Sequence, residues 1–398
     1  MRFSFITRNI LFLSIISFFT DVASEMLYPV IPLYLSTIGI SVTGIGFIEG
    51  VAETLSALSK TYFGIWSDKL QQRKLFIILG YGLSGLSKPL MIVFPNYLWT
   101  LLMRMLDRLG KGIRTAPRDA LLSDESSAQN KGKVFGFHRS MDTLGAAIGP
   151  LLTLFFLLVY RFSYQSIFLV SFIPGILAVL FSFLINEKKE QLIISQNKKF
   201  VQLKELFSYW SRSNSDYKWI TAILILFYVF NSSDMLLLLK ARSNGIDDYR
   251  VIILYIVYNI SYALLAFPFG MIGDKLGLKN TIASGLFFFG VVYCGIAFFD
   301  SWNALIVLFI LYGVYSAAIE GNIKALLSNV VDKKDTASAI GLFTTFQSFT
   351  FLISNSLAGW IWDTFNSSLP FIMSGIVAII VSIVLFFKKL SFNQHNLL

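Results

Sequence analysis

The feature that most constrains this chain is the charged stretch Arg104–Asp119, RMLDRLGKGIRTAPRD, which lies between apolar runs. At about 100° per residue, its charged side chains fall within roughly 140° of arc on one helical face that is about 21 Å long. A lipid-facing charge at mid-bilayer costs about 2.5–3.5 kcal/mol, so this face must meet a protein interior or a water-filled cavity. Its charged residues are Arg104, Asp107, Arg108, Lys111, Arg114, Arg118 and Asp119.

The composition indicates an all-α polytopic membrane protein. The chain is 55% hydrophobic and 14% charged, whereas soluble proteins carry about 25% charged residues. The apolar runs are continuous rather than alternating, which argues against a transmembrane barrel. The single Cys294 excludes an intrachain disulfide, and with only two His residues we expect no metal site and no cofactor.

Windows of about 20 residues predict twelve transmembrane helices. The first six are expected at 9–35, 42–66, 75–94, 97–120, 134–159 and 164–185. The second six are expected at 218–240, 250–272, 281–299, 302–326, 337–362 and 369–387. The predicted domains are an N-terminal six-helix bundle (1–185), a cytoplasmic central loop (186–217), a C-terminal six-helix bundle (218–388) and a cytoplasmic tail (389–398). Within the loop, Val201–Trp210 has the composition of a short interfacial helix.

The positive charges indicate the orientation of the chain. If the termini and the loops from even to odd helices share one side, that side holds most of the 33 Lys and Arg residues. The opposite loops hold only Arg161, Lys240, Arg242 and Arg250. The positive-inside rule therefore places both termini in the cytoplasm, in a bacterial-type inner membrane. This distribution also accounts for the net charge of +10 without a nucleic-acid partner.

The two halves of the sequence repeat at a nearly constant offset. Gly64 and Asp68-Lys69 recur as Gly270 and Asp274-Lys275. Ala120-Leu-Leu-Ser123 recurs as Ala325-Leu-Leu-Ser328. Such a repeat predicts two pseudo-symmetric six-helix bundles, related by an axis along the membrane normal, with a cavity between them.

These motifs resemble those of the major facilitator superfamily over nearly the whole chain. The loop Gly64-IWS-Asp68-Lys69-LQQ-Arg73-Lys74 is similar to its signature G-x-x-x-D-[RK]-x-G-[RK]-[RK], although Gln71 and Gln72 depart from it. Gly145-AAI-Gly149-Pro150 resembles the glycine/proline motif that the family's antiporters carry. The resemblance implies the family's fold and transport by rocking of the two bundles.

Acidic residues inside the expected spans are candidates for proton coupling. Asp21 and Glu25 share one helical face, and Glu49 and Glu53 share another with Lys60. A carboxylate that is desolvated in one state and beside Arg in another can exchange a proton during the cycle. The alternative is that these acids only form structural ion pairs. The full candidate set is Asp21, Glu25, Glu49, Glu53, Asp234 and Glu320.

Two further groups have other predicted roles. Side chains deep enough to bind substrate are Arg104, Asp107, Arg108, Lys111, Tyr28, Asn259 and Asn355; the Arg residues suit an anionic group, unless internal acids already pair with them. A cytoplasmic gate is predicted from Gly64, Asp68, Arg73, Arg114, Arg118, Asp119, Arg139, Asp142 and Asp274. For His138, a hydrogen bond to Asp142 is favoured over metal binding.

The sequence therefore predicts a secondary active transporter of a small organic solute, coupled to protons and directed to efflux by antiport. The alternative is proton-coupled uptake of an anionic metabolite, which the basic face of 97–120 allows. A non-transporting receptor would be expected to carry a soluble output domain, and no nucleotide loop, metal-ligand spacing or G-x-S-x-G elbow supports an enzyme. The expected partners are the substrate, protons and the lipid bilayer, and the sequence is silent on the oligomeric state.

Overall fold

The computed structural model describes residues 6–70, 72–127, 130–187, 203–332 and 335–388. Within these ranges the chain forms fifteen α-helices and no β-strand. Those before the central loop are α1 (Arg8–Leu27), α2 (Val30–Thr37), α3 (Val42–Leu70), α4 (Arg73–Leu90), α5 (Tyr97–Asp124), α6 (Lys131–Val159) and α7 (Tyr164–Phe183). Those after it are α8 (Leu203–Arg212), α9 (Ser215–Phe230), α10 (Asp234–Ser243), α11 (Asp248–Leu276), α12 (Leu278–Phe298), α13 (Trp302–Val330), α14 (Thr336–Thr364) and α15 (Leu369–Phe387).

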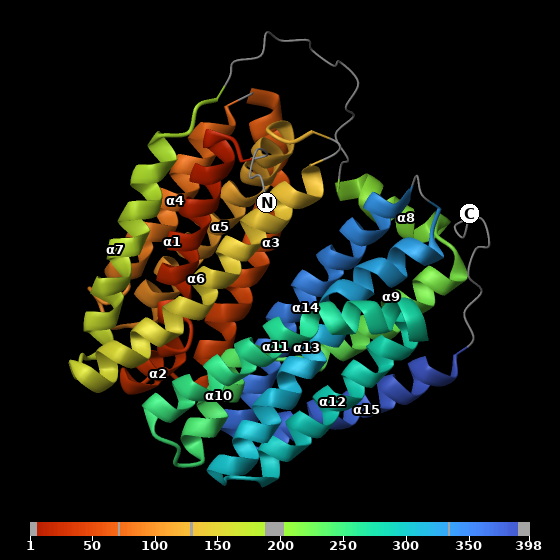
Figure 1. Ribbon diagram of the computed structural model, residues 1–398. Helices are drawn as coiled ribbons and strands as arrows, with labels where there is room; N and C mark the ends of the chain where they lie inside the picture. The colour runs from red at the N-terminus through yellow and green to blue at the C-terminus, as the bar shows by residue number, and fades with distance from the viewer. Residues whose placement is uncertain (1–5, 71, 128–129, 188–202, 333–334, 389–398) are drawn as a thin grey trace. The chain divides into compact units, whose positions relative to one another are not determined.

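The helices group into two compact units. Unit 1 comprises Met1–Ile40 and Val51–Lys198, and unit 2 comprises Ser41–Gly50 and Lys199–Leu398. In Figure 1, the helices of unit 1 run in colour from red to yellow-green and those of unit 2 from green to blue. Helix α3 begins in unit 2, where Asp363 accepts hydrogen bonds from the backbone and hydroxyl of Thr43. The predicted loop residues 188–202 and the predicted tail 389–398 lie outside the described residues.

Each of the twelve expected spans corresponds to one helix or to two consecutive short ones, which confirms the all-α class. Among the residues that the structure describes, eight helical segments are long and apolar enough to cross a membrane. The other four expected spans are α3, α4, α5 and α14, the first three of which carry several charges and the last many Ser and Thr residues. The expected interfacial helix corresponds to α8.

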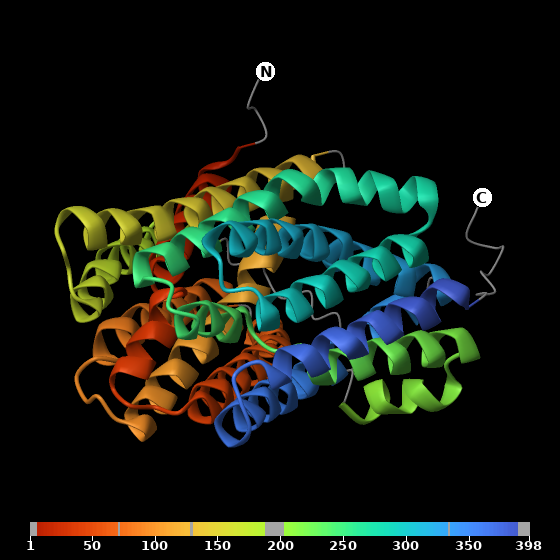
Figure 2. The same ribbon diagram turned by 90° about the horizontal axis from the view of Figure 1, so that it is seen from below.

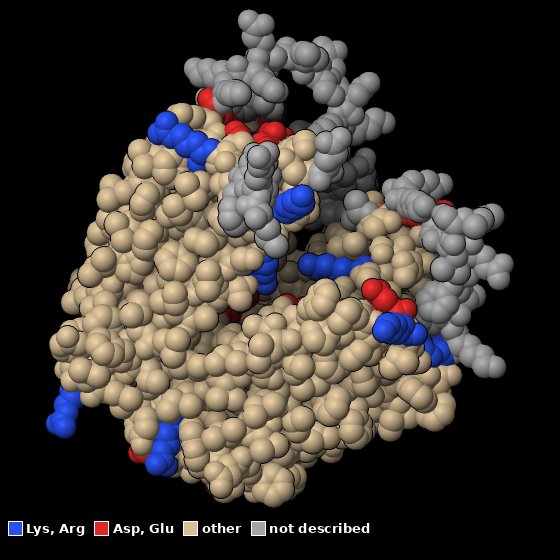
Figure 3. All heavy atoms as spheres, in the orientation of Figure 1, with Lys and Arg blue, Asp and Glu red and all other residues tan. Residues whose placement is uncertain are grey.

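The outer faces of the helices are apolar. Large hydrophobic side chains are exposed along several of them, among them Leu98 (73% exposed), Leu264 (70%) and Phe267 (74%). On the face shown in Figure 3, uncharged side chains cover most of the helix flanks, and Lys and Arg appear in a few separate places. Such flanks suit a hydrocarbon environment, in which water does not solvate side chains. The protein is therefore a multi-pass membrane protein.

Two of the expected spans are interrupted, which the sequence did not predict. The first breaks between α1 and α2 at Tyr28-Pro29, because Pro29 and Pro32 lack the amide hydrogens that a continuous helix needs. The seventh breaks at Asn231-Ser232-Ser233, where Asn231 has an extended backbone and Ser233 caps α10. Both breaks lie at equivalent places in the repeat.

The repeat also appears in the packing within each unit. Helix α4 contacts α5 and α7 in unit 1, just as α12 contacts α13 and α15 in unit 2, and Figure 2 shows α12 and α15 side by side. The backbones approach at Gly85 and Gly175 in one unit and at Gly290 and Gly375 in the other. The Lys74 ammonium donates to the Phe183 carbonyl, and that of Lys279 donates to the Phe386 carbonyl. The sequence repeat is therefore a repeat of helix contacts.

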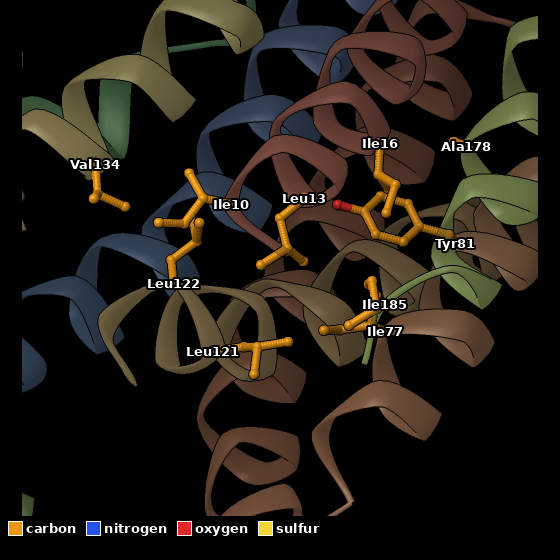
Figure 4. Packing of buried hydrophobic residues seen from close by; sticks show 10 residues of the cluster. All are labelled: Ile10, Leu13, Ile16, Ile77, Tyr81, Leu121, Leu122, Val134, Ala178 and Ile185. Atoms are coloured by element: carbon orange, nitrogen blue, oxygen red, sulfur yellow. The ribbon is translucent and has the colours of Figure 1, made fainter. Parts of the chain in front are cut away.

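Helices α1 and α6 run parallel, with a constant register. Val134 packs near Ile10 in the buried hydrophobic cluster of unit 1 (Figure 4). Further along both helices, Gly145 meets Asp21, and one turn later Gly149 meets Glu25. A methyl group at Gly149 would lie 2.8 Å from the Glu25 Cβ and the Met26 amide nitrogen. The glycines thus allow the two backbones to approach closely.

We predict that Gly149→Ala lowers the stability of the protein by about 1–3 kcal/mol, because the added methyl group meets backbone atoms that cannot move aside. Gly136→Ala, on the same helix, is the matched control, since a Cβ there meets nothing within 4 Å. Thermal unfolding in detergent would compare the two variants. Equal melting temperatures would contradict the close contact between α1 and α6.

Candidate functional site

The charged face of α5 points into the interior of unit 1. Arg104 (3% exposed), Asp107 (5%), Arg108 (7%) and Arg114 (5%) are buried, whereas Lys111 is exposed. The helix is continuous from Tyr97 to Asp124, with the Asn96 side chain capping its first turn. The single-face geometry expected from the sequence is therefore present, and its inner part is shielded from lipid.

Asp107 lies at the centre of a buried charge cluster. Its Oδ1 accepts hydrogen bonds from the Lys88 ammonium at 2.9 Å and the Ser84 hydroxyl at 2.5 Å. Its Oδ2 accepts from the Arg104 guanidinium at 3.0 Å. Both oxygens of the Asp107 carboxylate therefore accept hydrogen bonds from protein groups. A proton could bind to either oxygen only by displacing one of these contacts.

Lys88 and Ser84 are the site residues that sequence reasoning missed. They lie at i and i+4 on α4 and come to Asp107 only because α4 packs on α5. This packing is close at Gly80 and Gly110, where a Cβ on either glycine would meet the other helix. The sequence did contain a signal for this contact. Lys88 is a charged residue in an otherwise apolar span, and a charge in such a place needs a partner.

A second ion pair lies beside this cluster. The Arg108 Nε is 2.9 Å from the Glu53 Oε1 on α3. Helix α3 can approach because Gly112 faces Ser59 without a side chain between them. Arg104 and Arg108 therefore both have acidic partners inside unit 1. This is the alternative to substrate binding, in which internal acids pair with these arginines.

Arg114 differs from the other buried arginines. Its guanidinium lies 4.5 Å from the centre of the Tyr81 ring, and its Nη1 has no hydrogen-bond partner among the described residues. Arg114 therefore has a donor that no described side chain or backbone group accepts.

The two acids of α1, Asp21 and Glu25, lie at the contact with another helix. Asp21 lies beside Gly145 and Glu25 beside Gly149, at the contact with α6. Asp21 makes no hydrogen bond or ion pair with a described residue, although Lys111 and Arg118 act on it electrostatically. Tyr28 is half-buried at the end of α1. Asp21 is therefore the α1 acid whose carboxylate is least constrained by direct contacts.

Some of the predicted gate residues lie together around Arg73, at the start of α4. Arg73 pairs with both Asp68 and Asp124, and the Glu187 carboxylate accepts from the backbone amides of Arg73 and Lys74 at the start of α4. Gly64, on the same helix as Asp68, lies against Ala116 of α5. These contacts join α3, α4, α5 and the end of α7.

The remaining predicted gate residues lie apart from this cluster. Arg118 donates to Asp119 and to the Ser17 hydroxyl. Arg139 and His138 each approach Asp142 to 3.9 Å. Asp274, in unit 2, is exposed. Arg114 is turned inward to Tyr81 rather than toward the other gate residues.

Among the candidates assigned to unit 2, two lie at the break in the seventh span. Asp234 accepts a hydrogen bond from the Tyr312 hydroxyl at 2.5 Å. The Asn355 side chain accepts from the Ser233 amide at 2.8 Å, which satisfies a backbone group freed by the break. Asn355 therefore has a structural role that the sequence did not reveal.

The other unit 2 candidates are separate from this break. Glu320 accepts from Tyr262, and Asn259 bonds the Tyr255 carbonyl on its own helix. Glu49 is buried at the start of α3, in the segment that belongs to unit 2, whereas Glu53 belongs to unit 1. No group of three or more His, Cys, Asp or Glu side chains within the described ranges is arranged to hold a metal ion.

We predict that Asp107→Asn destabilises the protein by about 3–5 kcal/mol, because Lys88 and Arg104 would remain buried without their counter-ion. Asp119→Asn should cost at most about 1 kcal/mol, since that carboxylate is 38% exposed. Both values would come from thermal unfolding in detergent. A small effect of Asp107→Asn would show that the cluster does not hold α4 and α5 together.

Comparison with known proteins identifies the family to which these helices belong. A family model described as the Major Facilitator Superfamily matches residues 13–241 and 235–397. An uncharacterized MFS-type transporter of Methanocaldococcus jannaschii is 35% identical over 390 residues, covering 96% of this chain and 95% of that protein. The multi-drug resistance efflux pump PmrA of Streptococcus pneumoniae is 23% identical over 331 residues, covering 80% of each chain.

A solved structure of the nucleoside transporter NupG has the same fold. It matches with a TM-score of 0.79 and 14% sequence identity, covering 96% of this chain and 100% of that chain. At this identity the match concerns the fold alone.

Proposed function

The chain belongs to the major facilitator superfamily and is a membrane transporter, and from this premise we propose that it exports a small organic solute in exchange for protons. The protein would work by alternating access, in a bacterial-type inner membrane with both termini in the cytoplasm. The observation that carries the proton coupling is the contrast among the acids of unit 1.

Three acids of unit 1 differ in their freedom to exchange a proton. Asp107 is fixed by Lys88 and Arg104, and Glu53 is paired with Arg108. Asp21 has no such partner among the described residues. A proton carrier must gain and lose its proton without dismantling the fold, so Asp21 suits that role best.

Two observations support the efflux direction. The glycines of the antiporter-like motif in α6 form the contact with α1 and lie directly against Asp21 and Glu25. In addition, PmrA, a relative over most of its length, is described as a multi-drug resistance efflux pump.

Uptake of an anionic metabolite with protons is the second candidate. The buried Arg114 favours it, because one of its guanidinium nitrogens has no protein acceptor among the described residues. An anionic substrate could occupy such a site through charge-assisted hydrogen bonds.

We predict that substrate addition to proteoliposomes moves protons, and that the direction of movement separates the two candidates. Purified protein would first be screened by thermal shift against cationic drugs and anionic metabolites. Vesicles that contain a pH-sensitive dye would then receive the stabilising compound from outside. Alkalinisation of the lumen indicates antiport, and acidification indicates symport.

In the same assay, Asp21→Asn should abolish the pH change, because the amide cannot carry a proton. Asp300→Asn, at an exposed position, is the control that should leave it intact. Solute movement with no pH change in the unaltered protein would disprove proton coupling. An undiminished pH change in Asp21→Asn would remove Asp21 from the mechanism.

The Asp68–Arg73–Asp124 contact supports a gating role at one end of unit 1. We predict that Asp68→Asn slows transport several-fold, because the amide loses a charge-assisted hydrogen bond to Arg73 that would stabilise one state of the cycle. The thermal shift produced by ligand should stay the same, since the contact of Asp68 with Arg73 lies at the ends of α3 and α4. Unchanged turnover would rule out the gate.

A further inference from the structure

A second group of buried polar side chains lies on α6, away from the Asp107 cluster. The buried residues of α6 form one stripe, in which His138 and Asp142 precede Gly145 and Gly149. His138 is 4% exposed and Asp142 is 8% exposed. Because α6 lies parallel to α1 in constant register, this stripe faces the helix that carries Asp21.

The polar atoms of this pair lack partners. Both ring nitrogens of His138 and the Oδ1 of Asp142 have no hydrogen bond to a described residue. The His138 Nδ1 and the Asp142 Oδ1 are 3.9 Å apart, about 1 Å longer than a hydrogen bond. Buried groups of this kind cost about 1–3 kcal/mol each when unsatisfied, so a site that retains two of them calls for a function.

The helix register brings Asp21 to the same place. A Cβ on Gly145 would lie 3.0 Å from the Asp21 Cβ, and Asp142 is one turn before Gly145 on the same face. Asp142 is accordingly among the charges that act on Asp21. Two carboxylates and an imidazole therefore lie on facing sides of one helix contact.

The charges around these groups come from three helices. Helix α1 contributes Glu25 beside Asp21, α6 contributes Arg139, and α5 contributes Lys111, Arg114, Arg118 and Asp119. Arg118 is already hydrogen-bonded to Asp119 and Ser17. With neutral His138 and ionised acids, four carboxylates face four cations. A proton that binds here therefore adds one positive charge to a balanced group.

We propose that His138, Asp142 and Asp21 form the binding site of the transported proton. In the loaded state the proton is bonded to an oxygen of Asp21 or Asp142. When it moves to a ring nitrogen of His138, the O–H bond breaks, the N–H bond forms, and the carboxylate regains its negative charge beside the imidazolium. The proton then leaves along the end of α6 that carries Arg139, whose side chain is 70% exposed.

This inference rests on the proposed proton coupling, and it changes the predicted role of Asp142. As a gate, Asp142 would need a firm ion pair, yet Arg139 is 3.9 Å away and largely exposed. As a proton site, Asp142 needs a nearby group with which to exchange a proton, and it must not be held in a close ion pair. The contacts of Asp142 fit the second role.

The test measures proton binding without a substrate. Infrared difference spectra of the purified protein in vesicles would be recorded over a pH titration. We expect a protonated-carboxyl band that titrates in the unaltered protein, disappears in Asp142→Asn or Asp21→Asn, and shifts its midpoint in His138→Gln. Asp300→Asn should leave the band unchanged. A band that persists in both Asp142→Asn and Asp21→Asn, or whose midpoint does not shift in His138→Gln, would overturn the proposal.

Transport measurements then separate this site from the proposed function. Asp142→Asn and His138→Gln should lower the substrate-induced proton flux at least several-fold, and Asp142→Glu should recover part of it. If Asp142→Asn does not fold, His138→Gln and Asp142→Glu still carry the test through the band midpoint and the flux. Full proton flux in His138→Gln with an unshifted band overturns the site while leaving proton coupling intact. Absence of proton flux in the unaltered protein overturns the proposed coupling itself.

Discussion

The structure of unit 1 depends on the contact of Asp107 with Lys88 and Arg104. These side chains are buried between helices whose outer faces are apolar. An unpaired charge there costs far more free energy than at a water-exposed surface. Their pairing requires α4 and α5 to approach closely, which the glycines at positions 80 and 110 allow. One carboxylate thus neutralises two cations and fixes the position of the charged face of α5.

This pairing also limits which acids of unit 1 are available to exchange a proton. Asp107 and Glu53 are occupied by cations, so they serve the structure of the bundle in the described state. Asp21 and Asp142 lie at the α1–α6 contact, where Gly145 and Gly149 let the two helices approach closely. The paired charges and the charges of the proposed proton site therefore lie at different helix contacts of the same unit.

The glycine motif of α6 connects packing with function. Gly145 and Gly149 let α6 approach α1, and the same approach places Asp142 and His138 beside Asp21. A larger side chain at either glycine would separate the helices and the titratable groups together. The motif is thus a geometric requirement of the proposed proton site as well as of the fold.

The sequence by itself determined the helical membrane class, the repeat and the single charged face of α5, because each follows from local periodicity and from the cost of placing charge in lipid. It also indicated which acids lie in the spans. Only the tertiary structure decided which of them have partners: Lys88 reaches Asp107, and His138 approaches Asp142 beside Asp21, across contacts between helices. At the break near Asn231, the freed amide of Ser233 is likewise satisfied by a group distant in sequence, the side chain of Asn355. Pairing between helices depends on crossing geometry and register, which one sequence read along its length does not contain.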